Sequence, residues 1–418
     1  MSAILIILAE LAFGLWATRD FSQRERRFAL GALALHIVSS FGTVKVVEGG
    51  DALGYLQTGS ELALLLDFDF PRFAPEIFRL ALHLDANLPF ETFGAGSSTG
   101  TMGALAGFFV YGLGPSLLSA CLMTTVVGWF GQLCLYRVAR DEFAKEEQTA
   151  ALIGCLFVPS AVFWGSAFAK EAFVVGPFGV LALSTYRLFR KRHLLSLVGV
   201  VGGGVGVALL KPYILFPYII GVATWIYAER VRSKSGTIRV HPGYLALAAL
   251  VAAGGIAGVS SLFPEYGVSR IAETVADQQG GWLKISDTGS VLDVGSEDAR
   301  SLSQQLPYVP LALANALFRP LLFEARNGPM LGAALETTAT TLGLVTLILR
   351  FSWRRTLAAI LGSPPLMFSL SFVLLFAIAV GLATSNLGSL SRYRMPMMPF
   401  YATALLVLAA RSRKPTPQ

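Results

Sequence analysis

Long apolar runs separated by short polar segments form the dominant pattern of the chain. A helix needs roughly 17 to 25 mostly apolar residues to cross a bilayer, and the pattern predicts about eleven such helices. We therefore expect an all-α, polytopic membrane protein that forms one integral-membrane domain over residues 1–418. The expected helices lie near residues 2–17, 28–46, 114–136, 149–165, 172–188, 194–210, 213–229, 243–262, 331–349, 366–384 and 396–410.

The composition supports this class. The chain is 54% hydrophobic and 14% charged, with a mean hydropathy of +0.62. A net charge of +7 could suggest nucleic acid, but membrane proteins collect Lys and Arg in cytoplasmic loops, and no basic soluble region interleaved with aromatics is present. We expect membrane lipids and no nucleic acid as partners. The three cysteines lie in apolar runs without CxxC spacing, which favours inert core thiols.

Basic clusters set the expected orientation in a bacterial inner (plasma) membrane. Six clusters hold 21 of the 33 Lys and Arg residues, and all six can face the cytoplasm if the N-terminus is outside and the C-terminus cytoplasmic. Outer loops with amphipathic character are then expected near 47–113, 263–330 and 385–395. Residues 307–329 must not span, so we interpret them as a re-entrant or surface-lying helix on the outer side.

The short stretch "LGSLSRYRMPMMPF" places two arginines on this outer side. Basic residues are rare there, so Arg392 and Arg394 require an anionic partner, which is either an acid of the outer loops or a lipid-linked phosphate. Pro396 is expected to end the preceding helix. Both guanidinium groups, or one of them and the Tyr393 hydroxyl, could then face one phosphate.

The first outer loop opens with "GGDALGY", in which Asp51 and Tyr55 are four residues apart and share a face if the segment is helical. The rest of this loop mixes amphipathic turns with a run of small residues, and we expect it to lie on the membrane without a core of its own. In "AFAKEAF", Lys170 and Glu171 form the one polar step of a tight apolar hairpin. An ionisable pair is costly there and suggests function, although an ion pair of Lys170 with Glu171 that satisfies itself and pins the hairpin is an alternative.

Two further outer segments carry charged candidates. Lys211 in "ALLKPYILF" lies at an outer turn, where it could contact substrate or extend toward the membrane interface. Arg319 and Glu324 in "NALFRPLLFEARN" are five residues apart, do not share a helix face, and need not pair with each other. We include all three, with Tyr55 and Tyr393, as substrate-binding candidates.

Three of these stretches resemble the GT-C superfamily of integral-membrane glycosyltransferases, which includes the protein O-mannosyltransferases and the aminoarabinose transferase. The stretches are "GGDALGY", "PSAVFWGSAFAKEAFVVGPFGVLAL" and "SRYRMPMMPF". The resemblance implies that Asp51 occupies the position of the catalytic acid and that Lys170, Glu171, Arg392 and Arg394 line the donor site. The chain departs from the family in having one acid where many members have two, and an extra helix precedes the loop.

The chemistry of a lipid-linked donor agrees with this resemblance. A sugar leaves polyprenyl phosphate as an anionic phosphate ester, so the site needs positive charge for the leaving group and a carboxylate for the acceptor's proton. We expect a glycosyltransferase that moves a sugar from a polyprenyl-phosphate-linked donor to a glycan, lipid or protein acceptor on the outer face, in cell-surface polysaccharide or glycoconjugate assembly. The sequence does not decide whether a divalent cation is a cofactor, and we assign no residue as a metal ligand.

Other functions remain alternatives. A polysaccharide polymerase or ligase acting on lipid-diphosphate-linked glycans would share the many helices and would use the outer arginines for diphosphate. A secondary transporter would show charges at mid-helix and inverted repeats. Glu10 and Glu336 are the few such charges, and no repeat is evident. A non-catalytic assembly subunit is the remaining alternative.

Overall fold

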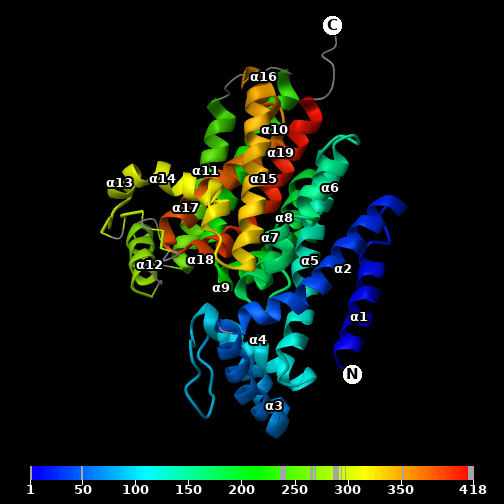
Figure 1. Cartoon of the computed structure of the whole chain (residues 1–418), viewed down its shortest axis with the longest axis vertical. Coiled ribbons are helices and arrows are strands. Elements are labelled where there is room, and N and C mark those ends of the chain that lie inside the picture. Colours follow the sequence, from blue (N-terminus) through cyan, green and yellow to red (C-terminus); the bar gives the residue numbers. More distant parts are fainter. Residues whose placement is uncertain are drawn as a thin grey trace. The chain divides into compact units, whose positions relative to one another are not determined.

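The computed structural model of the chain describes residues 2–48, 50–235, 242–263, 267, 270–285, 291–292, 294–296, 298–350 and 353–412 (Figure 1). Every regular element in these ranges is a helix, and their only strand-like contact is an isolated antiparallel bridge between Val291 and Asn386. The all-α prediction is therefore confirmed. The chain divides into two compact units: unit 1 comprises Met1–Val138 and Ala161–Lys211, and unit 2 comprises Ala139–Ser160 and Pro212–Gln418.

Seven helices of the described part are long and apolar enough to cross a membrane, consistent with a multi-pass membrane protein. The predicted count of eleven is not confirmed. Three helices at predicted spans are shorter than a full span, and the run at 149–165 is broken because Pro159 disfavours helical geometry at the residue before it. The seven are α2 (Gln23–Val47), α5 (Leu117–Glu142), α8 (Lys170–Arg190), α10 (Leu215–Ser235) with the preceding η1 turn (Pro212–Ile214), α11 (Pro242–Leu262), α15 (Gly328–Arg350) and α17 (Pro364–Ala383). The shorter helices are α1 (Ser2–Ala17), α9 (Ser196–Leu210) and α19 (Met398–Ser412), and the broken run forms α6 (Gln148–Leu156) and α7 (Pro159–Trp164).

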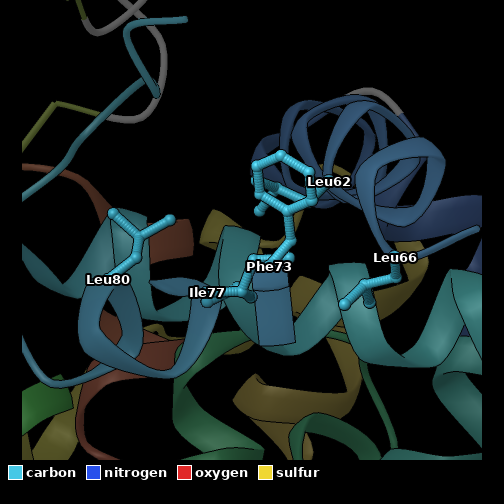
Figure 2. Packing of buried hydrophobic residues seen from close by; sticks show 6 residues of the cluster. Leu62, Leu66, Phe73, Ile77 and Leu80 are labelled. Atoms are coloured by element: carbon cyan, nitrogen blue, oxygen red, sulfur yellow. The ribbon is translucent and has the colours of Figure 1, made fainter. Parts of the chain in front are cut away.

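The first predicted outer loop is a helical hairpin in unit 1. Helix α3 (Asp51–Ala81) packs along α4 (Ser98–Leu113), and Figure 2 shows the buried row that α3 contributes to the contact. Leu62 and Leu66 of this row are almost fully buried and lie four residues apart on one helix face, and Ile77 in the second half of the helix is fully buried as well. The segment therefore has an apolar core of its own, contrary to the expectation. The sequence showed the amphipathic pattern of this segment, but it did not show that α4 covers the apolar face of α3.

Helix α3 is bent where its sequence contains two prolines. Asp69 has non-helical angles (φ −155°, ψ 84°), and Pro71 and Pro75 follow within the same helix. A proline lacks the N–H group for the helical hydrogen bond and clashes with the preceding turn, which accounts for the bend. The bend lets the second half of α3 continue to contact α4, as the burial of Phe73 and Leu80 shows.

In unit 2, α17 is a central helix that packs against α10, α14 (Val309–Phe318) and α19, while α19 also packs against α6. Helix α14 has 10 residues, too short to span, as the re-entrant or surface-lying interpretation of 307–329 requires. The remaining elements of unit 2 are α12 (Ile271–Ile285), α13 (Leu302–Gln305), α16 (Trp353–Leu361), α18 (Leu387–Tyr393), η3 (Leu306–Tyr308), η4 (Leu322–Glu324) and η5 (Met395–Met397). Parts of the predicted outer loop at 263–330 lie outside the described residues.

Candidate functional site

The turn that leads into α8 is held by buried polar contacts within unit 1. Ser166 is fully buried; its hydroxyl lies 3.0 Å from Nδ1 of His36, and its carbonyl accepts a hydrogen bond from the Thr43 hydroxyl at 3.1 Å. His36 and Thr43 both belong to α2. Four residues later, α8 starts at Lys170, so these contacts with α2 fix where the Lys170 side chain begins.

Lys170 points toward the start of α4. Its ammonium group donates hydrogen bonds to the Ser98 hydroxyl at 2.9 Å and to the Thr99 hydroxyl at 3.0 Å. It also lies 5.8 Å from the centre of the Tyr55 ring, a distance at which the ring face attracts a cation. Lys170, Ser98 and Thr99 are all half-buried, so the three side chains are partly accessible from outside the protein.

The two hydroxyls have donor capacity left. In the described part of the chain each accepts from Lys170, and neither Ser98 nor Thr99 donates its own hydroxyl hydrogen to another group. An anion placed beside them could therefore accept two hydroxyl hydrogen bonds next to a fixed positive charge. The backbone N–H groups of Thr99 and Gly100 are already used, by the Ser97 hydroxyl and the Gly94 carbonyl. The side chains, rather than the helix N-terminus, form the candidate anion site.

A glycine-rich loop shapes this end of α4. Gly94 has φ +74°, and a Cβ there would lie 2.6 Å from the Cβ of Thr99. At Gly100, a Cβ would lie 2.6 Å from the carbonyl oxygen of Gly94. Real Cβ atoms do not approach so closely, so glycine is needed at both positions for the loop to close over the first turn of α4. This requirement explains the small residues in "FGAGSSTG".

Aromatic contacts join the site to α3. The Tyr55 ring packs edge-on against Phe168 with 6.3 Å between ring centres, and Phe168 also contacts Phe109 of α4 at 6.1 Å. Tyr55 is buried, whereas Asp51 lies exposed one turn earlier, at the first position of α3. The predicted shared face of Asp51 and Tyr55 thus exists. An acid in this position also interacts favourably with the positive end of the helix.

Glu171 and Lys211 form a buried ion pair in unit 1. The Lys211 ammonium lies 2.5 Å from a carboxylate oxygen of Glu171, and the two residues are 5% and 0% exposed. The alternative of an interfacial Lys211 is therefore wrong. Glu171 is bound by Lys211, the C-cap of α9, so this ion pair links α8 to α9, whereas the alternative drawn from the sequence was a pair between the neighbouring Lys170 and Glu171. Both groups are better assigned to holding α8 and α9 together than to contacting substrate.

Arg394 in unit 2 is fully buried. Its guanidinium donates to the carbonyls of Ala316 at 3.2 Å and Arg319 at 2.6 Å, and to the Thr337 hydroxyl at 2.6 Å. Burial lowers the pKa of this guanidinium, and the Glu336 carboxylate opposes the shift. The predicted helix end is present, because α18 stops at Tyr393 with Arg394 as its C-cap. The guanidinium, however, ties α18 to α14 and α15.

The other predicted residues of unit 2 have their own partners. Arg319 and Glu324 form an ion pair, which their five-residue spacing had left open. The chain between them is a turn rather than a continuous helix, so helical spacing does not apply. This hydrogen bonding lowers the pKa of Glu324. Arg392 is half-exposed beside the Tyr393 ring, with 6.0 Å from its guanidinium carbon to the ring centre.

No protein-family model, curated protein or solved structure matches this chain. The assignment therefore rests on the chemistry of the residues. In the part of the chain that the structure describes, no three His, Cys, Asp or Glu side chains gather in a way that could hold a metal ion. The strongest candidate is the anion cluster in unit 1, which we define as Lys170, Ser98 and Thr99.

Sequence reasoning identified Lys170 but missed its two hydroxyl partners. Ser98 and Thr99 are 72 and 71 residues away along the chain, and they lay in a stretch interpreted only as small residues. A signal was nevertheless present: glycines followed by Ser and Thr before an apolar run are typical of a tight turn that starts a helix. What such a signal cannot supply is the identity of the distant cation.

Proposed function

We propose that this protein is a membrane glycosyltransferase that transfers a sugar from a polyprenyl-phosphate-linked donor to an acceptor on the outer face of a bacterial inner membrane, in the assembly of a surface polysaccharide or glycoconjugate. The observation that supports this proposal most is the anion cluster of Lys170, Ser98 and Thr99. Its charge and free hydroxyl donors suit a lipid-linked phosphate. The seven candidate spans supply the membrane setting that such a donor needs.

In the proposed reaction, the anion cluster stabilises the leaving phosphate. The bond between the sugar carbon and the phosphate oxygen breaks, and the negative charge that develops on the oxygen is stabilised by the Lys170 ammonium and the two hydroxyls. The acceptor hydroxyl forms the new bond to the sugar and gives its proton to a carboxylate. Asp51 is our choice for this base because it is exposed and lies one turn from Tyr55, whose ring contacts Lys170. Asp51 is therefore the proposed catalytic residue.

The polymerase or ligase alternative receives less support. That function was expected to use the outer arginines for diphosphate, but the Arg394 guanidinium is engaged by backbone carbonyls and Thr337, and Arg319 is paired with Glu324. Arg392 is half-exposed, and its guanidinium lies beside the Tyr393 ring. We therefore favour a single lipid phosphate as the anion.

The proposal can be tested without knowing the sugar or the acceptor. Polyprenyl phosphate is titrated onto the purified full-length protein, and the rise in melting temperature is measured for the wild type and for Lys170→Met. The wild type should be stabilised by mass action and the variant should not. Lys191→Met is a matched control, because Lys191 ends the same helix and also lies over a tyrosine, 5.5 Å from the ring centre of Tyr186. This control should behave as the wild type.

Turnover then tests the reaction itself. Membranes carrying the wild type are given polyprenyl-phosphate-linked sugars with labelled sugar groups, and release of polyprenyl phosphate is followed. Asp51→Asn should bind the lipid phosphate normally and lose transfer. Equal binding of polyprenyl phosphate by wild type and Lys170→Met would remove the anion cluster from the donor site. Unchanged transfer by Asp51→Asn would show that another group takes the proton.

A further inference from the structure

Helix α16 in unit 2 separates apolar from basic side chains around its axis. Trp353, Leu357 and Ile360 recur at helical spacing and share one face, whereas Arg354 and Arg355 lie away from its centre. No residue of α16 is buried in the protein, and Trp353 and Leu357 are 69% and 44% exposed. The described part of the chain therefore leaves the apolar face of this helix uncovered.

The position of α16 along the chain brings it to a membrane face. Helix α15 ends at Arg350 and α17 begins at Pro364, and both are candidate spans, so the segment that joins them must lie where both leave the bilayer. The helix is also anchored within unit 2. Arg411 of α19 donates to the carbonyl of Ala359 at 3.1 Å and to the Ser363 hydroxyl at 3.3 Å, while it pairs with Glu147 at 2.8 Å.

The charges around α16 are not balanced by the chain. In the described residues, Arg350 and Arg355 make no hydrogen bond or ion pair through their side chains, and Arg354 contacts only the Trp353 ring, at 5.5 Å. The nearby acid Glu147 is already paired with Arg411. A surface that offers negative charge above an apolar layer would satisfy both sides of the helix at once. The headgroup region of a membrane with anionic lipids has this arrangement.

We propose that α16 is an interfacial helix that binds anionic lipid headgroups, with Trp353 and Leu357 at the acyl boundary and Arg354 and Arg355 on the lipid phosphates. This surface belongs to unit 2 and is independent of the proposed glycosyltransferase reaction, whose anion cluster lies in unit 1. Its role is to fix the depth and tilt of the α15–α17 corner in the membrane. The lipid occupies the face of α16 that the described residues leave uncovered.

The depth of the helix can be measured with a fluorescent label on Leu357→Cys, in liposomes of phosphatidylcholine and phosphatidylglycerol. The three native cysteines are buried, so the introduced thiol should react selectively. The label should be quenched by nitroxide-bearing lipid and protected from aqueous iodide. Ala358→Cys is the matched control, one residue further and about 100° around the helix, and its label should be more open to iodide. Equal iodide access at both positions would overturn the proposal.

Lipid preference is tested by native mass spectrometry of the full chain from mixed micelles of the same two lipids. The wild type should retain phosphatidylglycerol, and the Arg354→Gln/Arg355→Gln variant should lose affinity roughly fivefold for each arginine. Arg354→Lys/Arg355→Lys keeps the charge and should retain the lipid. Equal retention by the glutamine variant would reject anionic lipid as the occupant and would leave α16 as a surface for another protein or for water.

Discussion

Replacing Lys211 by Met should destabilise unit 1 much more than replacing Lys170 by Met, although the two lysines carry the same charge. Lys211 neutralises Glu171, which is 0% exposed, at a distance of 2.5 Å. Its loss would leave a buried carboxylate without its cation, which costs about 3 to 5 kcal/mol. Lys170 is half-buried and donates to two neutral hydroxyls, and its loss should cost only about 1 to 2 kcal/mol.

These free energies translate into a measurable difference in melting temperature. For a domain of 150 to 250 residues, 1 kcal/mol corresponds to about 2 to 4 °C, so Lys211→Met should lower the melting temperature by about 6 to 20 °C and Lys170→Met by about 2 to 8 °C. The assay is thermal unfolding of the detergent-purified protein, followed by circular dichroism. The Glu171→Leu/Lys211→Met double variant removes both charges and should recover most of the loss, because a buried ion pair replaced by apolar residues is often neutral.

The same variants separate structure from function. The double variant should still be stabilised by polyprenyl phosphate, since it keeps Lys170, Ser98 and Thr99. Lys170→Met should fold and fail to respond. The reasoning is refuted if the double variant is as unstable as Lys211→Met, because the ion pair would then not be the cause of the loss. It is equally refuted if Lys170→Met is the less stable of the two single variants.

Three further predictions follow from particular contacts. Gly94→Ala should weaken polyprenyl phosphate binding more than Gly96→Ala, measured by the same titration, because only at Gly94 does the added Cβ collide with Thr99; both positions share a positive φ. Hydrogen bonding from Arg319 lowers the pKa of Glu324. The pair therefore stabilises the fold at pH values above the ordinary carboxyl pKa, and this stabilisation is lost as the pH falls through the lowered pKa. In Arg319→Gln, the melting temperature should depend less on pH in this acid range. A cysteine at Ser389 should react with a membrane-impermeant thiol reagent in intact cells if α18 faces outward, and labelling only after permeabilisation would reverse the predicted orientation.

The hydrophobic pattern predicted the helical class, whereas the predicted count of eleven spans is not confirmed, for a physical reason. The length of an apolar run is not the length of a helix, because backbone chemistry can end a helix within the run. Pro159 divides the run at 149–165, and α9 ends at Leu210, with Lys211 as its C-cap directly before Pro212. Both breaks could be read from the prolines. Their consequence, a helix too short to cross on its own, depends on how the neighbouring residues pack.

The partners of the charged residues could not be predicted from spacing. Glu171 and Lys211 are 40 residues apart, and Lys170 and Ser98 are 72 apart, so no helical or strand period relates them. Spacing also left the pairing of Arg319 and Glu324 open, because the segment turns at Pro320 and helical spacing does not apply to it. Spacing rules hold within one element, as for Asp51 and Tyr55 in α3. Spacing rules do not predict which other element packs beside that helix.

The arginines between α17 and α19 show how one backbone feature separates two similar side chains. The helix end expected from Pro396 occurs at Tyr393, and at this end the two guanidinium groups take different environments. Arg394 is fully buried, and its donors bind α14 and α15, whereas Arg392 stays half-exposed beside the Tyr393 ring. The Arg394 guanidinium donates to buried carbonyls and a hydroxyl and does not reach solvent. Arg394 can therefore affect a ligand only by holding α14, α15 and α18 together. Of the two, Arg392 alone can meet a phosphate without repacking unit 2.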